Sequence, residues 1–257
     1  MHDEDRAVWV TWYNLPEQGR EAYFDWLHGS HIPRLLERPG YLWAAHYASL
    51  PHGDKVPRRH GKKFNTDDPS VPAGDRFIFI IGGRDAGVFG DPPPSVLRGQ
   101  LPENDRKMLA LRQGERINVM IDCARVQGPA GPAYKRGMNP PPCIQMGSFN
   151  CALEDEEDVL RWYAQWRLPA MRTLEGCVRA RLLASVYGWA KHSVFYEFET
   201  LEARNHFLRS HEDGDENRAW TDKVIASLMH APGSANVAQR IWPPVSAEEA
   251  RARAQSQ

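Results

Sequence analysis

The sequence predicts an α+β protein in which two tandem β-α-β-β-α-β units, each ferredoxin-like, pack sheet to sheet as an α+β barrel. Residues 8–50 align without a gap with residues 144–186, and eight of the 43 pairs are identical, with a Trp, a Pro and a Gly among them. Each copy also presents extended apolar runs and amphipathic helical patterns in the same order. Helices cover only one sheet face in such a unit, so two units can bury their bare faces against each other.

The first unit begins with an extended run at residues 8–13, followed by an amphipathic helix at 17–38. Gly40 follows this helix, and glycine readily adopts the left-handed conformation that ends helices. Strands are then expected at 42–50 and 76–81, a second helix at 101–113 and a closing strand at 117–122.

The second unit repeats this order. Strands are expected at 144–149, 178–186, 193–198 and 235–240, and helices at 155–174 and 201–210, with more helical sequence near 217–230. The predicted domains are therefore residues 6–122 and 143–242. A Gly- and Pro-rich linker at 123–142 joins them, and a tail follows at 243–257.

Composition and charge exclude several classes of function. Lys and Arg number 32 against 33 Asp and Glu, so there is no basic field and no nucleic-acid partner is expected. The apolar runs are far shorter than the roughly 20 residues that cross a bilayer, so no membrane association is expected. The acidic residues 1–5 predict no signal peptide, and four cysteines without CxxC spacing predict reduced thiols in a cytoplasmic protein with no metal site.

The run from Trp26 to Tyr41, WLHGSHIPRLLERPGY, resembles the first helix of dimeric α+β barrel proteins. It is most similar to EthD-like and antibiotic-biosynthesis-monooxygenase-like members, which carry a tryptophan and a His-x-Pro before a Pro-Gly turn. The second unit keeps Trp162 and Pro169 but has Arg167 opposite His31. The resemblance implies a barrel from a group that includes cofactor-free oxygenases, polyketide cyclases, lactone isomerases, haem enzymes and proteins without known activity.

Strand alternation assigns side chains to the two faces of each sheet. We expect Val8, Val10 and Trp12 to face the helices, as their counterparts in the second unit do. The side chains expected inside the barrel include Trp9, Thr11, Tyr13, Trp43, Tyr47, Gln145, Gly147, Phe149, Arg179, Arg181 and Glu197. Two interpretations of this mixed interior remain open: a pocket in which Arg181 holds a carboxylate or enolate, and a structural Arg–Glu bridge.

His31 is the predicted proton carrier, because a histidine titrates near neutral pH. Tyr13 and Tyr47 are the predicted donors to a developing oxyanion. His28 lies three positions before His31 and joins the predicted substrate-binding residues Trp9, Trp43, Arg179, Arg181 and Glu197. The alternatives for His31 are helix packing and metal or haem ligation, and His46 is expected to be a hydrogen-bonded core histidine.

These residues predict a small-molecule enzyme acting on an aromatic, polyketide-like or lactone carboxylate. The expected chemistry is acid–base: isomerisation, cyclisation, decarboxylation or cofactor-free oxygenation. The motifs GxxxxGK[ST], GxGxxG and GxSxG are all absent, so no nucleotide cofactor is expected. A non-catalytic binding or accessory protein and a haem-binding barrel enzyme are the alternatives, and a homodimer is an open alternative to a monomer.

The connection from Pro51 to Asp75 is about 19 residues longer than its counterpart in the second unit. It carries the basic residues Lys55, Arg58, Arg59, Lys62 and Lys63. Long loops in compact domains are usually functional or disordered. The two interpretations are a lid that attracts an anionic ligand and a solvated insertion.

Overall fold

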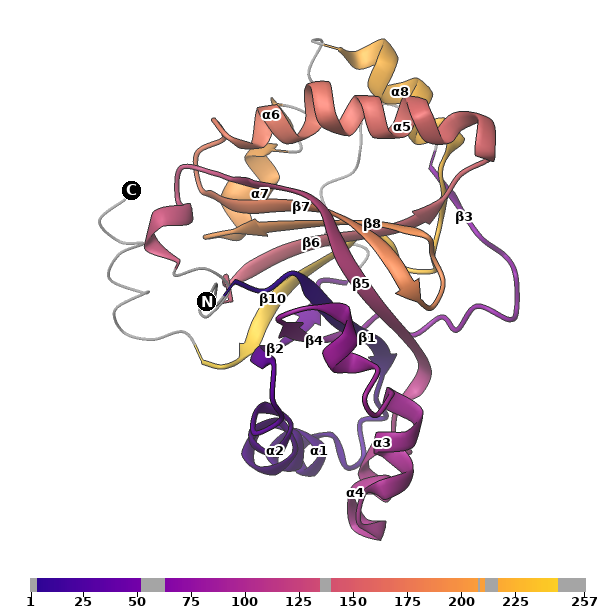
Figure 1. The fold of residues 1–257 in the computed structure, drawn as a ribbon, viewed down its shortest axis with the longest axis vertical. Helices are drawn as coiled ribbons and strands as arrows, with labels where there is room; N and C mark the ends of the chain where they lie inside the picture. Colours follow the sequence, from indigo (N-terminus) through magenta and orange to yellow (C-terminus); the bar gives the residue numbers. More distant parts are fainter. Residues whose placement is uncertain (1–3, 52–62, 135–139, 208, 211–216, 245–257) are drawn as a thin grey trace.

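The computed structural model describes residues 4–51, 63–134, 140–207, 209–210 and 217–244. Its centre is an eight-stranded antiparallel barrel, and helices cover the barrel on two opposite sides (Figure 1). The barrel closes because β10 (Asn236–Trp242) pairs with both β2 (Tyr41–Ser49) and β6 (Cys143–Asn150). Closure removes the open sheet edges that would otherwise invite association with other chains.

The chain divides into a first half, residues 4–127, and a second half, residues 140–244. The first-half strands lie in the order β5-β1-β4-β2. The remaining bounds are β1 (Ala7–Asn14), α1 (Arg20–Trp26), a π-helical turn (Leu27–His31), α2 (Ile32–Leu36), β4 (Phe77–Gly83), α3 (Pro94–Gln100), α4 (Glu103–Leu109) and β5 (Gln113–Gln127).

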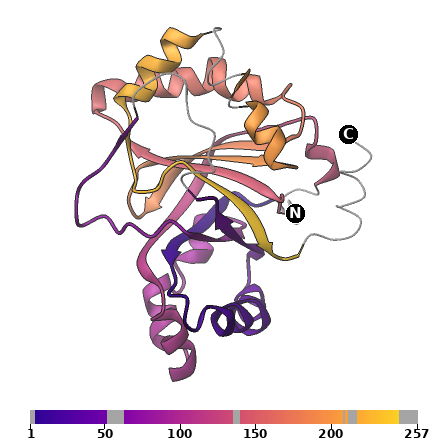
Figure 2. The same cartoon turned by 180° about the vertical axis from the view of Figure 1, so that it is seen from behind.

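The second-half strands lie in the corresponding order β10-β6-β8-β7. Strand β10 crosses between the two layers of helices and joins the halves (Figure 2). The bounds are α5 (Glu156–Trp162), a π-helical turn (Tyr163–Arg167), α6 (Leu168–Met171), β7 (Cys177–Tyr187), β8 (His192–Phe198), α7 (Leu201–Phe207) and α8 (Arg218–Ser227). Strands β1 and β6, helices α1 and α5, and the two π-helical turns all lie 136 residues apart.

The helix expected at 17–38 contains a wide turn that the sequence pattern did not predict. The Ile32 amide donates to the Leu27 carbonyl five residues back, and the Leu168 amide donates in the same way to Tyr163. A proline follows each turn, at Pro33 and at position 169. A proline ring has no N–H and clashes with the carbonyl four residues earlier, so a wider turn relieves both problems.

Two further boundaries differ from the expectation. Helix α3 was not predicted, and β5 continues five residues into the expected linker. This extension is a strand because Ala124–Gln127 pair with β7 of the second half, which a local pattern cannot reveal. The expected ends of the two first helices hold, since Gly40 and Gly176 have φ of 84° and 72°.

The long first-half connection is only partly described, because residues 52–62 lie outside the described residues, as do 245–257 of the expected tail. Beyond this gap the connection forms β3 (Phe64–Asn65), which pairs with β9 (Met229–His230) of the second half. The Asn65 side-chain amide also donates to the Ala231 carbonyl at 2.7 Å. The described part of the predicted lid therefore lies against the second half.

The first strand of each half has the opposite orientation to the one expected. Val8, Val10 and Trp12 pack inside the barrel, whereas Trp9 and Tyr13 pack under the first-half helices. The same reversal places Ile144 and Met146 inside and Phe149 outside. Both faces of these strands are buried and carry apolar residues, and the few polar residues, Thr11, Gln145 and Ser148, are buried too, so no exposed polar face fixes the register.

The interior also contains buried charge, and that charge is paired. Arg181 is fully buried, and its guanidinium contacts Asp5 at 2.7 Å and Asp122 at 2.8 Å. Arg179 makes a two-point contact with Glu197, with both N–O distances 2.7 Å. The two pairs connect β5, β7, β8 and the N-terminal segment across the barrel wall.

Among the described residues, no helix is both long enough and apolar enough to span a bilayer. All four cysteines are free thiols, of which Cys143 and Cys177 are buried.

We expect Arg181→Met to lower the free energy of unfolding by about 3–5 kcal/mol, because it leaves the buried carboxylates of Asp5 and Asp122 with Arg125 as their one remaining cation. Chemical denaturation measures this change. The control is Lys107→Met, which removes the cation of an exposed pair with Glu103 and should cost under about 0.5 kcal/mol. Equal effects of the two substitutions would contradict a structural role for the interior pair.

Candidate functional site

The predicted site residues lie on two different sides of the barrel wall. Trp43, Tyr47, Arg179, Arg181 and Glu197 are inside the barrel, as expected. Trp9, Tyr13, His28 and His31 instead lie on the helix side of the first-half sheet. The sheet therefore separates the predicted set into two groups that cannot contact the same ligand.

The interior group has structural partners. Arg179 and Arg181 both form the ion pairs described above. Of the two interpretations of the interior, these contacts favour the structural bridge and not the ligand pocket. Tyr47 is fully buried, and its hydroxyl donates to the Pro141 carbonyl at 3.0 Å. Trp43 packs so closely on Gly82 that a side chain at that glycine would collide with the indole ring. The predicted oxyanion donor Tyr47 thus secures the segment before β6.

A cavity of about 150 Å³ lies between the first-half helices and the sheet. Strands of the first-half sheet form the floor of the cavity, and helices α2, α3 and α4 form its walls. The lining residues are Trp9, His31, Arg34, Leu35, Arg38, Phe79, Pro94, Leu97, Arg98, Leu101, Leu109, Arg112 and Ile117. An apolar cavity of this volume holds a molecule the size of benzene.

The charge around this cavity is positive. Its lining contains four arginines and one histidine but no carboxylate. Two carboxylates stand behind these arginines: Asp105 contacts Arg34 at 2.6 Å, and Glu115 contacts both Arg98 at 2.6 Å and Arg112 at 2.7 Å. Four guanidinium groups against two carboxylates leave an excess of positive charge at the cavity.

Arg112 is the most constrained of the four arginines. Its side chain is 5% exposed, its Nε donates to the Tyr23 hydroxyl at 2.6 Å, and its Nη1 donates to Glu115 at 2.7 Å. Its guanidinium also lies over the Tyr13 ring, 4.5 Å from the centroid. Among the described residues, Nη2 has no hydrogen-bond partner. A buried donor without a partner is costly, so this nitrogen is a candidate contact for a ligand.

His31 lines the same cavity and stacks on Trp26, with ring centroids 4.6 Å apart. Burial, together with the nearby charge of Arg112, lowers the pKa of His31 to about 3. Trp26 is itself held by a hydrogen bond from its indole N–H to Asp105 at 2.9 Å. His31 is therefore a neutral imidazole held in one orientation beside the cavity.

Tyr13 belongs to a buried chain of polar side chains behind Arg112. Its hydroxyl hydrogen-bonds His46 Nε2 at 2.8 Å, and His46 Nδ1 hydrogen-bonds His28 Nε2 at 2.9 Å. His46 is fully buried, which agrees with the hydrogen-bonded core histidine expected for it. Burial raises the pKa of Tyr13 well above its usual value and lowers the pKa of His28 to about 4. This chain supports Tyr23 and Arg112 but does not itself line the cavity.

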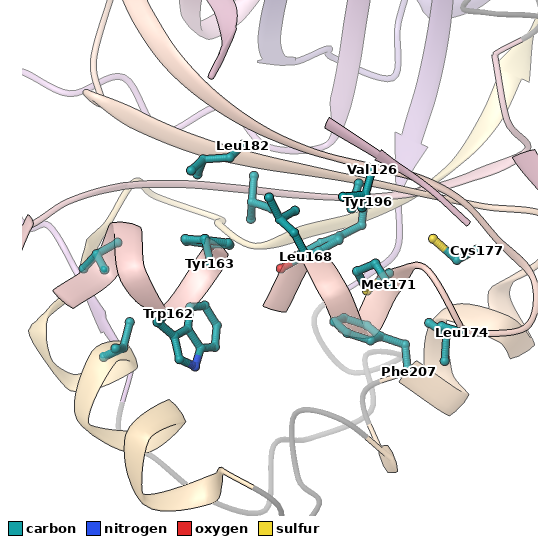
Figure 3. Close-up of a cluster of buried hydrophobic side chains, with 14 of the residues drawn as sticks. Val126, Trp162, Tyr163, Leu168, Met171, Leu174, Cys177, Leu182, Tyr196 and Phe207 are labelled. Atoms are coloured by element: carbon teal, nitrogen blue, oxygen red, sulfur yellow. The ribbon is translucent and has the colours of Figure 1, made fainter. Parts of the chain in front are cut away.

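At the corresponding position of the second half, the described side chains pack closely. Arg167 stands where His31 stands in the first half, is 1% exposed, and donates from Nε to the Tyr196 hydroxyl at 2.9 Å. Its guanidinium lies 4.6 Å from the Phe207 ring centroid. Figure 3 shows buried apolar side chains of this region, with Leu168 pointing from its helix toward the sheet and Trp162 on the opposite side of the helix, toward α8. The asymmetry predicted from the His31–Arg167 pair is thus visible in the packing.

A haem does not fit the first-half cavity in this arrangement. His31 offers a neutral ring nitrogen, which suits an iron ligand. A porphyrin, however, has four pyrrole rings, and the cavity matches a single six-membered ring. A haem would require α2 and α3 to separate.

Among the described residues, one group has the ligand types and spacing of a metal site: Cys151, Glu156 and His192. All three are only partly buried, and the Glu156 carboxylate is already paired with the Lys191 ammonium at 2.5 Å. A cation would have to displace this lysine, so the group is better explained as a surface ion pair.

No family model matches the sequence, and no curated protein matches it significantly. Solved structures do share its fold. A candidate monooxygenase from Fusobacterium nucleatum subsp. nucleatum has a TM-score of 0.59 at 10% identity over 93% of each chain. An anthrone oxidase-like protein has a TM-score of 0.61 at 10% identity over 94% of each chain. A candidate chlorite dismutase has a TM-score of 0.51 at 12% identity, covering 93% of this chain and 95% of its own. At these identities the likeness establishes a shared α+β barrel fold.

Sequence reasoning identified His31 but missed the arginines around it. Arg112 falls at the end of the helix expected at 101–113, and Arg34 directly follows Pro33. The signal that could have found Arg34 is its spacing of three from His31, which places both on one helix face. Arg112 comes from a distant element, and only the tertiary fold brings it to the cavity.

The neutral buried histidines predict a loss of stability in mild acid. The pKa of His31 is lowered on folding, so the unfolded chain takes up a proton below about pH 6.5 that the folded protein does not. From pH 7 to pH 5 this histidine should therefore lower the free energy of unfolding by about 2 kcal/mol. Denaturant titrations at several pH values measure the slope. His31→Gln should reduce it, whereas the same substitution at the exposed His206 should not.

Proposed function

We propose that the protein is an α+β barrel enzyme that acts on a small organic molecule in the first-half cavity, by proton transfer through His31. The observation that carries the proposal is the neutral His31 ring beside an apolar cavity that also contains buried, positively charged Arg112. Burial, a cation and a neutral base together are typical of sites that remove a proton and stabilise the resulting anion.

His31 acts as the proton carrier in this proposal, and Arg112 replaces Tyr47 and Arg181 as the anion-stabilising group. Without ligand, His31 is a weak base because burial and Arg112 disfavour its charged form. An anion formed beside it offsets both effects and favours the protonated ring. The base is thus strengthened when negative charge develops on the substrate.

The reaction class is proposed from the fold and the cavity together. Isomerisation, cyclisation and cofactor-free oxygenation begin with an anion that His31 forms by removing a proton and that Arg112 stabilises. In decarboxylation the anion instead forms as carbon dioxide leaves, Arg112 stabilises it, and the protonated His31 ring returns a proton to carbon. The similar folds of a candidate monooxygenase and an anthrone oxidase-like protein favour oxygenation, with dioxygen as the second substrate. We also propose that the halves are two ferredoxin-like units, since both have the strand order fourth-first-third-second.

Turnover tests the role of His31. We expect the protein to consume dioxygen with a subset of hydroxylated aromatic substrates, and His31→Gln to lower the rate by about 10²- to 10⁴-fold, the usual contribution of a general base. Oxygen uptake and product mass are the measurements. The control variant is His192→Gln, because His192 lies in the second half and does not line the first-half cavity. If the protein binds hydroxylated aromatic compounds but converts none of them, with or without dioxygen, the result would instead support an accessory binding protein.

A titration with haemin tests the haem alternative. Because the cavity matches one small ring, we expect no saturable Soret band shift and no difference between the wild-type protein and His31→Ala. A saturable shift that His31→Ala abolishes would mean that the helices separate to admit haem.

A further inference from the structure

We propose that the first-half cavity binds a single-ring aromatic carboxylate, a benzoate-type anion, whose carboxylate accepts a hydrogen bond from Nη2 of Arg112. This inference rests on the proposed function, because it names the substrate class for the same cavity.

The hydrogen bonds of Arg112 identify the contact. Tyr23 and Glu115 occupy Nε and Nη1, and the guanidinium plane is held over the Tyr13 ring. The orientation of the group is therefore set before any ligand binds, which reduces the entropy lost on binding. Nη2 is the guanidinium nitrogen that has no hydrogen-bond partner among the described residues, and a carboxylate is the acceptor with which guanidinium forms its strongest hydrogen bonds.

The charge balance favours an anion over a neutral ligand. Glu115 must serve both Arg98 and Arg112, so one carboxylate faces two guanidinium groups. Arg98 and Arg34 have side chains that are 42% and 45% exposed, whereas Arg112 is buried. Water can solvate the exposed arginines, but Arg112 depends on neighbouring groups to offset its charge.

The size and chemistry of the remaining lining favour one aromatic ring. Besides its cations, the cavity is lined by the aromatic rings of Trp9 and Phe79 and by aliphatic side chains. Its volume of about 150 Å³ suits one six-membered ring and leaves little room for a second fused ring. The polyketide-like substrates considered from the sequence, which carry several rings, are therefore disfavoured.

Equilibrium binding tests this inference without any need for turnover. Calorimetry with the full chain would compare benzoate with benzamide, an uncharged molecule of the same shape, with acetate, which lacks the ring, and with anthracene-2-carboxylate, which has three rings. We expect benzoate to bind at least 10-fold more tightly than each of the others. No binding of benzoate at millimolar concentration, or equal binding of benzamide, would overturn the carboxylate assignment. Tighter binding of the three-ring acid would overturn the size assignment.

Variants then locate the contact. Arg112→Gln should weaken benzoate binding by 10- to 100-fold. The variant should still fold, because Glu115 keeps Arg98 as its partner and no carboxylate is left unpaired. Arg167→Gln removes an equally buried arginine from the second half and should leave binding unchanged. Leu97→Trp fills the cavity without changing its charge and should abolish binding even if Arg112→Gln does not fold. Unchanged binding in Leu97→Trp would place the ligand elsewhere.

The test separates this inference from the proposed function. His31→Gln should bind benzoate within a few-fold of the wild-type affinity while losing turnover, because the anchor is Arg112. Binding of benzoate together with no catalysis would overturn only the proposed function. Catalysis on an uncharged substrate together with no benzoate binding would overturn only the inference.

Discussion

The closure of eight strands into a narrow barrel is the constraint on which the rest of the molecule depends. A barrel of this strand number has an interior that side chains can fill. Here aliphatic and aromatic side chains fill most of it, and the ion pairs of Arg179 and Arg181 occupy the remainder. The cavity beside His31 lies outside the barrel wall, between sheet and helices, and its chemistry comes from side chains that project outward.

The two outer spaces differ at the end of the π-helical turn and in the helices that cover it. His31 is short and leaves room beside Trp26, whereas Arg167 is long and extends into the aromatic cluster of the second half. The π-helical turn occurs in both halves, so the turn alone does not make the cavity. Helix α3, which lines the first-half cavity, has no counterpart between β8 and α7 of the second half.

Much of the fold was predictable from the sequence because the repeat fixes the order of elements twice. Strands β1 and β2 and their counterparts β6 and β7 lie where the 136-residue shift placed them, and β4 and β8 lie where their apolar patterns predicted strands. The orientation of β1 was not predictable, since Trp9 and Trp12 are both large, apolar and buried. Because of this reversal, Trp9 and Tyr13 lie on the helix side and not in the interior. The sequence identified His31 but not its partner Arg112, which comes from a distant part of the chain.

The close packing around Arg167 has a consequence for symmetry. A symmetric pair of identical half-length chains would have to carry either two cavities like the one beside His31 or none, because every substitution would appear in both copies. Joining the two halves in one chain removes this restriction. One half can then keep an open space beside His31 at some cost in packing, while the described side chains around Arg167 in the other half pack closely.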